Sequence, residues 1–457
     1  MHDNNFCLRT WRRKFSGLVL GASLTSALCA QGTITEIHTL PEQGLGSFQN
    51  TYLPGTVLYD HGFKLGGVGS DLWKGPGDGP GVFWMITDRG PNPQTAAPVR
   101  RSFPVAAWTP FILKVKAENG VISILQAIPL TGNGGGAVTG LPNEPLATSP
   151  ANPNALGDEQ PYNCDITAVI PGNHDGLDPE GLVRDVHGNF WVADEYGPSL
   201  SKISAAGLVL KRFVPVGRAA VSGDHYTVVG NLPQILGRRP RNRGFEGLAI
   251  TPNNKTLMAV VQSPLVNPNT ATGNASRVVR IIAFDADTET PVAEYAYVMQ
   301  GVNEFNNTNP TEMKISGIAA LDQHRFLVLE RTDAVAKIYK VDVRQATNIL
   351  GTKWDLSATS PTLESLATFA APATTTDTLA ANGVTALAKE LVIDLSTLGP
   401  AIPPKIEGLT VLDGKTIAVS NDNDFQVGPP TCGPNVPPTN PAAQSSIFVI
   451  KLDKPIK

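Results

Sequence analysis

Short apolar runs alternate with polar turns along the chain, and residues 178–200 show this arrangement most clearly. The segment DPEGLVRDVHGNFWVADEYGPSL opens near Glu180-Gly181, passes through a turn at 185–189 and leaves an aromatic and aliphatic run at Asp194-Glu195. Alternation with a period of two, aromatic and β-branched residues, and Asp, Gly and Asn in the turn are typical of a β-hairpin. The segment therefore predicts one hairpin with carboxylates at both ends.

The same order of strand, turn, strand and polar exit recurs in four further segments, which begin near residues 67, 246, 316 and 407. In three copies the opening position lies 14 residues before the polar exit, namely Glu180 to Asp194, Ser316 to Glu330 and Glu407 to Asn421. A shared register places the polar ends of the copies at equivalent positions. Two of the intervals between successive copies are about 70 residues long. A four-stranded propeller blade takes only about 40–45 residues, so we expect loop insertions in these intervals.

We predict an all-β fold, a single β-propeller-like domain over residues 31–457 with six blades, within a range of five to seven. A β-sandwich of unrelated hairpins is the alternative, and the recurring Glu-Gly in one register favours the propeller. The apolar strand at 446–451 is expected to complete a blade that begins near the start of the domain. Stretches rich in Gly and Pro at 131–163 and 429–443 are predicted insertion loops, and a helix is expected near 384–393.

Composition is typical of a folded, exported chain. Hydrophobic residues make up 41% and charged residues 17% of the 457 positions, which suits a sizeable core. Residues 1–30 hold basic residues, then an apolar run, then small residues, which is the pattern of a secretory signal peptide. A secreted or periplasmic location is therefore predicted. No later run of 18 apolar residues follows, so no integral membrane segment is expected after signal removal.

Net charge limits the classes of binding partner, and the cysteines allow one disulfide. Residues 1–29 carry four basic residues and one acidic residue, so their removal changes the formal net charge from −4 to −7. A mildly acidic surface argues against nucleic acid as a partner. Cys164 and Cys432 remain after signal removal, and an oxidising compartment permits a disulfide between them. Two unpaired loop cysteines are the alternative.

Four motifs carry a resemblance to a known family. At DPEGL…FWVADEYGP, NRGFEGLAI…VVQSP, IEGLTVL…VSNDNDF and TDRGPN (87–92), the chain resembles the phytase-like family, also described as having esterase-like activity of phytase. The resemblance covers roughly residues 45 to 450. It implies an exported β-propeller-like fold and hydrolysis of ester or phosphoester bonds. Two positions depart from the repeated pattern, because Ser316 stands where Glu is expected and Gln262 stands where an acidic exit is expected.

Carboxylates of the repeats are expected to converge on the central channel, because equivalent inner-strand positions of a propeller face one another. Several carboxylates in one funnel repel each other unless a positive charge lies among them. Oxygen-rich clusters suit hard cations, and Ca²⁺ accepts six to eight oxygen ligands with loose geometry. We therefore predict a calcium site, or a site for another divalent metal, with the ligands Glu180, Glu246, Glu407, Asp88, Asp194 and Asp422.

Arginines beside the motifs offer a second source of positive charge. Arg89, Arg243 and Arg331 are predicted to bind the anionic part of a substrate, since Arg grips phosphate or carboxylate with two hydrogen bonds. Glu195 and Glu330 are the predicted catalytic residues. The alternative for any single motif glutamate is a structural role, in which it caps backbone amides or pairs with an arginine of the next blade.

The favoured function is an exported hydrolase that cleaves a small anionic ester or phosphoester with the help of a divalent metal. A gluconolactonase-like lactonase or carboxylesterase with one divalent ion is the second possibility, and a non-catalytic binding propeller of the cell envelope is the third. The sequence has no GxSxG, HExxH or P-loop motif, so a nucleophile-elbow esterase, a zincin and a P-loop nucleotidase have no support.

Overall fold

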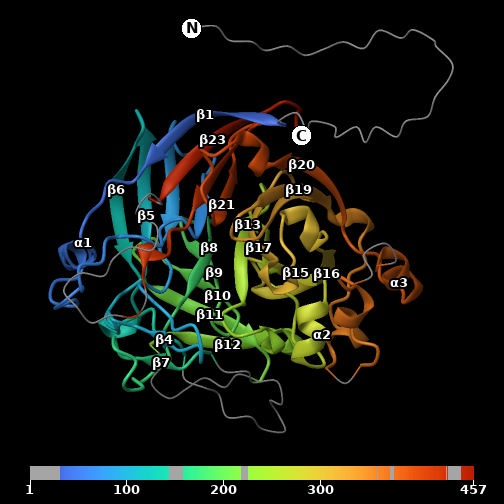
Figure 1. Cartoon of the computed structure of the whole chain (residues 1–457), viewed down its shortest axis with the longest axis horizontal. Helices are drawn as coiled ribbons and strands as arrows, with labels where there is room; N and C mark the ends of the chain where they lie inside the picture. The colour runs from blue at the N-terminus through green and yellow to red at the C-terminus, as the bar shows by residue number, and fades with distance from the viewer. Residues whose placement is uncertain are drawn as a thin grey trace, which may run out of the picture.

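The computed structural model describes residues 31–143, 158–217, 225–357, 359–370, 375–428, 430 and 444–456. Four large sheets surround a central axis (Figure 1). The predicted signal peptide, and large parts of both predicted insertion loops, lie outside the described residues. Cys164 is disulfide-bonded, and Cys432 lies outside the described residues.

Five strands form the innermost ring within the described part of the chain. They are β2 (Asp71–Trp73), β8 (Pro179–Arg184), β13 (Phe245–Ile250), β17 (Lys314–Ala320) and β21 (Ile406–Val411). Each packs against the next, and β2 also packs against β21, which closes the ring. The all-β propeller-like domain is therefore confirmed. Five blades lie within the predicted range of five to seven and are one fewer than the expected six, because loops and short helices occupy the long intervals between repeats.

Each inner strand starts one blade, and the five sequence repeats are the five blades. The first blade adds β3 (Val82–Ile86), β5 (Phe111–Glu118) and β6 (Val121–Pro129), and the second adds β9 (Phe190–Asp194), β10 (Ser199–Ile203), β11 (Val209–Pro215) and β12 (Thr227–Leu232). The third adds β14 (Thr256–Val261), β15 (Val278–Asp285) and β16 (Thr290–Val298). The fourth adds β18 (Arg325–Arg331), β19 (Ala336–Asp342) and β20 (Ala388–Asp394).

The fifth blade joins the two ends of the domain. It contains β21, β22 (Thr416–Asn421), β23 (Ser446–Leu452) and β1 (Gly32–Thr39), and β1 pairs antiparallel with β23. The prediction that the strand at 446–451 completes a blade begun near the start of the domain is confirmed. Figure 1 shows this pair along the upper edge, where the blue and red ends of the colour scale meet.

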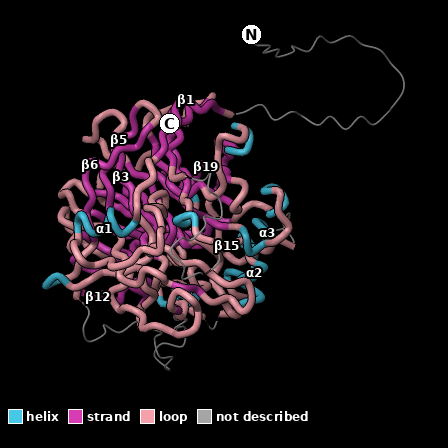
Figure 2. Tube along the Cα trace, turned by 60° about the vertical axis from the view of Figure 1, so that its left-hand side comes forward, coloured by secondary structure: helices cyan, strands magenta, loops and turns pink. Residues whose placement is uncertain are grey.

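Helices are short and lie in the connections between strands (Figure 2). Within the described residues the α-helices are α1 (Leu45–Tyr52), α2 (Thr270–Ala275) and α3 (Thr375–Ala381), and the small sheet of β4 (Arg101–Ser102) and β7 (Pro161–Tyr162) also lies outside the blades. The prediction of a helix near 384–393 is wrong, because residues 388–394 form β20, which pairs with β19. Among the described residues, no helix has the length and apolar character needed to span a membrane.

The recurring Glu-Gly of the motifs is a β-bulge at the start of an inner strand. The strand register shifts between Pro179 and Gly181, and the corresponding shift recurs in β13, β17 and β21, which leaves one residue out of the ladder each time. A β-bulge redirects the side chain of the extra residue. Glycine follows because the next blade is close: a Cβ at Gly181 would lie 2.8 Å from the backbone nitrogen of Leu248 in β13.

Candidate functional site

A cavity of about 750 Å³ opens where the inner strands begin, and residues from all five blades line it. Three recurring positions of the blades build its wall, although not every one of them is exposed to the cavity in every blade. The lead position lies just before the bulge, and the bulge position is the residue that the bulge leaves out of the ladder. The exit position is the last residue of the second strand of the blade or the residue that follows it. The exit amide donates to the lead carbonyl in four blades, from Asp88 to Gly67 (2.9 Å), Glu195 to Asp178 (3.0 Å), Gln262 to Gly244 (2.8 Å) and Asp422 to Lys405 (3.0 Å).

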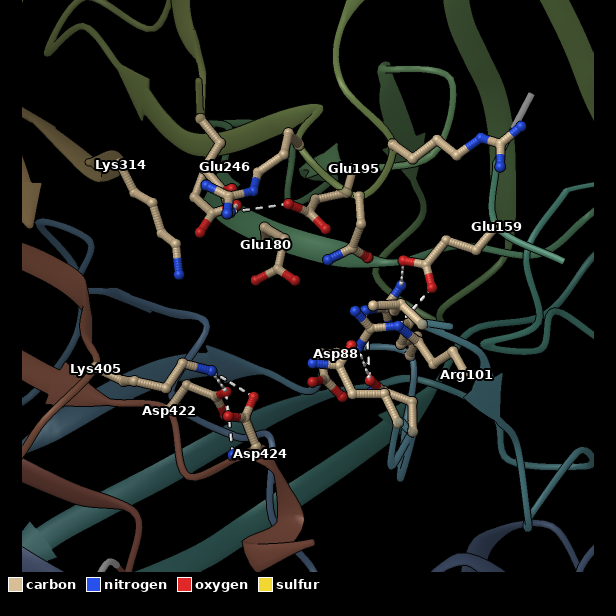
Figure 3. Close-up of a pocket in the computed structure, with 18 of the residues that line it drawn as sticks. Asp88, Arg101, Glu159, Glu180, Glu195, Glu246, Lys314, Lys405, Asp422 and Asp424 are labelled. Atoms are coloured by element: carbon tan, nitrogen blue, oxygen red, sulfur yellow. Dashed lines mark hydrogen bonds and ion pairs between the residues drawn. The ribbon is translucent and has the colours of Figure 1, made fainter. Parts of the chain in front are cut away.

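The second blade carries an acid at all three positions. One carboxylate oxygen from each of Asp178, Glu180 and Glu195 lies within 4.8 Å of those of the other two. Glu180 projects into the open centre of the cavity (Figure 3), and among the described residues it has neither a hydrogen bond nor an ion pair. Burial, and then the neighbouring carboxylate of Glu246, raise the pKa of Glu180 well above its ordinary value.

A hard divalent cation fits this acidic triad. Asp178 is only 1% exposed, burial raises its pKa well above the ordinary value, and Arg89 is its one cationic contact, at 3.2 Å. The unpartnered carboxylate of Glu180 adds a negative charge that no side chain of the described residues neutralises. Three carboxylates that converge from one blade supply the oxygen donors that Ca²⁺ prefers.

The third blade connects the triad to the rest of the cavity through Gln262. Its amide nitrogen donates to Glu195 at 2.9 Å and to Glu246 at 2.6 Å, and the two carboxyl groups also share a hydrogen bond. Burial, and then the charge of Glu246, raise the pKa of Glu195 to about 8. Burial, and then the charge of Glu407, raise the pKa of Glu246 to about 7. An acid at position 262 would add repulsion here, which explains the glutamine.

The fourth blade has the opposite charge, with Lys314, Ser316 and Arg331 at its three positions. Arg331 Nε donates to the Ser316 hydroxyl at 2.7 Å, and that hydroxyl donates to Glu246 at 3.2 Å. Arg331 also pairs with Glu407 of the fifth blade. The serine therefore leaves room for an arginine that connects two motif glutamates, so the departure in this repeat has a structural reason.

Arg243 lies next to this basic blade, and the nearby carboxylates of Glu195 and Glu246 favour its charge without forming an ion pair with it. Its guanidinium donates to the Ser263 hydroxyl at 3.1 Å, and no carboxylate of the described residues lies within ion-pair distance. Burial, and among its neighbours the positive charge of Arg331, lower the pKa of Arg243. Burial, then Arg331 and Arg243, lower the pKa of Lys314 as well. Three neighbouring cations that repel one another form a favourable place for an anion.

Arg89 follows the exit position of the first blade and is held by acids. It lies 3.2 Å from Asp178 and 3.4 Å from Glu159, and Glu159 also accepts a hydrogen bond of 2.5 Å from Arg101. Asp88, at the exit position itself, faces the cavity, and burial followed by the charges of Asp422 and Asp178 raises its pKa well above the ordinary value. Arg89 therefore neutralises part of the acidic triad and is less open to an anion than Arg243.

Two predicted site residues do not line the cavity. Asp194 accepts hydrogen bonds from Arg212 (2.6 Å) and Ser199 (2.5 Å), and Glu330 pairs with Lys389 and accepts from the Gln300 amide at 2.9 Å. The spacing of 14 residues selects Asp194 and Glu330, which lie one residue before the exit position. Neighbouring residues of a strand point to opposite faces, so these two carboxylates face into the blades and bind cations there.

The other predicted residues do meet in the cavity. They are Asp88, Arg89, Glu180, Glu195, Arg243, Glu246, Arg331, Glu407 and Asp422. Sequence reasoning missed the lead residues Asp178, Lys314 and Lys405, although each lies two residues before a motif Glu or Ser and the repeat itself marks them. It also missed Arg101 and Glu159, which come from connections outside the repeats and carry no periodic signal.

The motif residues that build the cavity run from Gly67 to Asp424, and the sequence model of the phytase-like family, described as esterase-like activity of phytase, matches residues 64–425. The chain belongs to the phytase-like family. An uncharacterized secreted protein of Arthroderma benhamiae is 28% identical over 340 residues, which cover 64% of this chain and 64% of that protein. The chain thus matches less than two thirds of this relative's length.

Solved structures resemble the fold of this phytase-like chain at low similarity. A PQQ-bound aldose sugar dehydrogenase from Streptomyces coelicolor is 12% identical, with a TM-score of 0.33, and the match covers 87% of this chain and 97% of that one. A luciferin-regenerating enzyme is 11% identical, with a TM-score of 0.31 and coverage of 84% and 80%. The Dos1 propeller is 7% identical, with a TM-score of 0.28 and coverage of 84% and 67%.

Proposed function

We propose that the protein is an exported hydrolase that cleaves a small anionic ester, most simply a phosphoester, with a divalent cation bound by the second blade. One observation supports this function above the others: a single cavity has Glu180 and Glu195 of the all-acidic second blade on one side and the cations Arg243, Lys314 and Arg331 on another. A cation at the first and an anion at the second would neutralise both clusters. The relative described as a secreted protein supports the secreted or periplasmic location.

Asp178, Glu180 and Glu195 would hold the cation, with Ca²⁺ the favoured ion and another divalent metal the alternative. The cation supplies positive charge that polarises a phosphoryl or carbonyl oxygen. Glu246 and Glu407, which were predicted as ligands, instead bind Gln262, Ser316 and Arg331. They connect neighbouring blades and fix the positions of the charges around the cation.

The anionic group of the substrate would contact Arg243 and Lys314, with Arg331 behind them. Arg243 has no carboxylate partner, so its binding of an anion breaks no ion pair in the described part of the chain. Lys314 lies 2.9 Å from Asp333 and also lines the cavity, where its ammonium can make a second contact. The cationic cluster thus positions an anion opposite the acidic triad.

Glu246 is the proposed proton carrier. It lies between the acidic triad and the cations Lys314 and Arg331, shares a hydrogen bond with Glu195, and has its pKa raised to about 7 by burial. A carboxyl group that titrates near neutral pH is suited to give a proton to a leaving alcohol and to take one from an attacking water.

Hydrolysis assays on chelator-stripped protein test the proposal. Phosphomonoester, phosphodiester, carboxylester and lactone probes are compared with and without added Ca²⁺. We expect calcium-dependent phosphate release, which Glu180→Gln abolishes. Hydrolysis of the lactone or carboxylester alone would assign the protein to the second predicted class, and no turnover together with tight calcium binding would assign it to non-catalytic binding propellers. Either of the last two outcomes overturns the phosphoesterase proposal.

A further inference from the structure

The second and fifth blades carry related sets of residues at the same three positions. Asp178, Glu180 and Glu195 in the second blade correspond to Lys405, Glu407 and Asp422 in the fifth, because the bulges align and the exit amide donates to the lead carbonyl in both. Two of the three positions stay acidic. The lead position changes from a carboxylate to an ammonium.

The Lys405 ammonium lies where the carboxylates of the fifth blade converge. Its Nζ is 3.1 Å from Asp422 Oδ2 and 3.9 Å from Glu407 Oε1, and it also pairs with Asp424. Figure 3 shows Lys405 reaching toward Asp422 and Asp424 at the wall of the cavity. An ammonium and a hard divalent cation use the same oxygen atoms, so Lys405 takes the place that a metal ion would occupy in this blade.

A backbone turn with unusual dihedral angles holds Asp424 against the lysine. Asp424, Phe425 and Gln426 have φ values of 45°, 51° and 54°, and Lys405 has 57°. Residues other than glycine adopt this left-handed region at an energetic cost, and such strain persists where the surroundings enforce it. Phe425 provides the anchor, since it is 2% exposed and packs edge-on against Trp108 at 5.8 Å. The fold therefore keeps Asp424 close to Lys405.

One carboxylate oxygen of this cluster is left over. Asp422 is 4% exposed, and its Oδ1 is buried without a hydrogen-bond partner among the described residues. Lys405 reaches Oδ2 of the same carboxylate and leaves Oδ1 unsatisfied. A buried oxygen without a partner is costly, and it is an additional donor for any cation that replaces the ammonium.

We propose that Lys405 is a built-in counter-ion that blocks a second divalent-cation site. The wild-type chain then takes one divalent ion, in the second blade, and loss of the ammonium converts Glu407, Asp422 and Asp424 into a second site. The count of one ion rests on the proposed function, whereas the latent site in the fifth blade depends on Lys405 with Asp422 and Asp424, and on Glu407, which Arg331 also binds.

The number of calcium ions bound per chain tests directly whether Lys405 blocks a second site. Chelator-stripped protein is titrated with Ca²⁺ by calorimetry, and bound calcium per chain is counted by equilibrium dialysis with atomic emission. We expect one ion for the wild type, two for Lys405→Met and one for Lys405→Arg, which keeps the positive charge. The double variant Lys405→Met with Glu180→Gln should keep one ion, now in the fifth blade. Lys314→Met, which removes the lead lysine of the fourth blade, should add none, since Ser316 and Arg331 replace the acids there.

Three outcomes would overturn the proposal: a folded Lys405→Met variant that binds no more calcium than the wild type, a wild type that already fills both sites, or Lys405→Arg gaining an ion. Failure of the proposed function looks different, because the wild type would then bind no ion while Lys405→Met gained one. If Lys405→Met unfolds without calcium, its melting temperature in calcium decides: a rise larger than that of the wild type supports the latent site, and no rise contradicts it.

Discussion

Gln262 donates from one amide nitrogen to both Glu195, at 2.9 Å, and Glu246, at 2.6 Å. A residue that departs from the acidic pattern of the repeats thereby joins two carboxyl groups that would otherwise repel each other. The site depends on such neutral or positive substitutions at chosen positions as much as on its acids.

Gln262→Glu should make the fold dependent on calcium. The new carboxylate would lie against Glu195 and Glu246, both of which are buried, and a buried like-charge contact is destabilising. We expect the free energy of unfolding to fall by about 2–4 kcal/mol without metal and to recover in part with Ca²⁺. Urea denaturation with and without calcium measures both. Gln262→Met is the matched control, and its loss of stability should not respond to calcium; an equal response in both variants would contradict the charge argument.

Glu180→Gln should raise stability without metal while weakening calcium binding. Its carboxylate is half-buried among other carboxylates and has no hydrogen-bond partner in the described residues, and glutamine keeps nearly the same shape without a negative charge. We expect the metal-free protein to gain on the order of 1 kcal/mol and the calcium affinity to fall at least tenfold, since one ligand of the triad is lost. Thermal melts in chelator and in calcium report the two effects. A melting temperature that drops in chelator would mean that Glu180 has a structural role instead.

Arg243→Met should weaken binding of the anionic substrate with little effect on folding. The guanidinium has only a hydroxyl partner, so its removal leaves no buried carboxylate unpaired, whereas a charged contact to an anion is worth about 1.5–3 kcal/mol. We expect KM to rise about 10- to 100-fold and the melting temperature to stay close to that of the wild type. Arg344→Met, at an arginine paired with Asp342 far from the cavity, is the control. An unchanged KM would remove Arg243 from the site.

Asp71 should make stability depend on pH in the acidic range. It is 4% exposed, burial raises its pKa to about 7, and the Leu182 and Leu72 amides donate to it at 2.7 Å. Its unfolded pKa is 3.8, so between about pH 4 and 7 the unfolded chain loses this proton while the folded chain keeps it. This group therefore lowers stability as pH rises through that window, by up to about 4 kcal/mol. Relative to Asp71→Asn, the wild type should lose melting temperature from pH 4 to 7; parallel profiles would refute the assignment.

Asp194→Asn tests the structural placement of a residue that the sequence predicted as a ligand. Its carboxylate and Arg212 are both fully buried, so neutralisation leaves a buried guanidinium without its counter-charge. Breaking a buried ion pair from one side costs about 3–5 kcal/mol. We expect a loss of that order in urea denaturation, together with a calcium affinity within twofold of the wild type. A large loss of calcium affinity in a folded variant would return Asp194 to the metal site.

The sequence predicted the fold and the site residues correctly where the repeats share a register, and it did not predict the residues that lie outside the repeats. The Glu-Gly bulges, the hairpins and the polar exits all follow from local patterns, so the propeller and most cavity residues could be predicted. The side of the sheet that each exit residue faces could not be predicted. Neighbouring residues of a strand point to opposite faces, so an error of one residue in the exit position, as for Glu330, selects a side chain that faces into the blade. The contacts of Glu159 and Arg101 arise from irregular connections, whose course depends on tertiary packing and not on periodicity.

The pairing of β1 with β23 has a consequence for when the site forms. Thr35 donates to the carbonyl of Val449, 414 residues further along the chain. The fifth blade is therefore incomplete until nearly all of the domain has been synthesised, and pairings between such distant segments form slowly. Lys405, Glu407 and Asp422 belong to this late blade, while Asp178, Glu180 and Glu195 belong to an early one. As the chain folds, the cavity would acquire its acidic side first and its closing wall last.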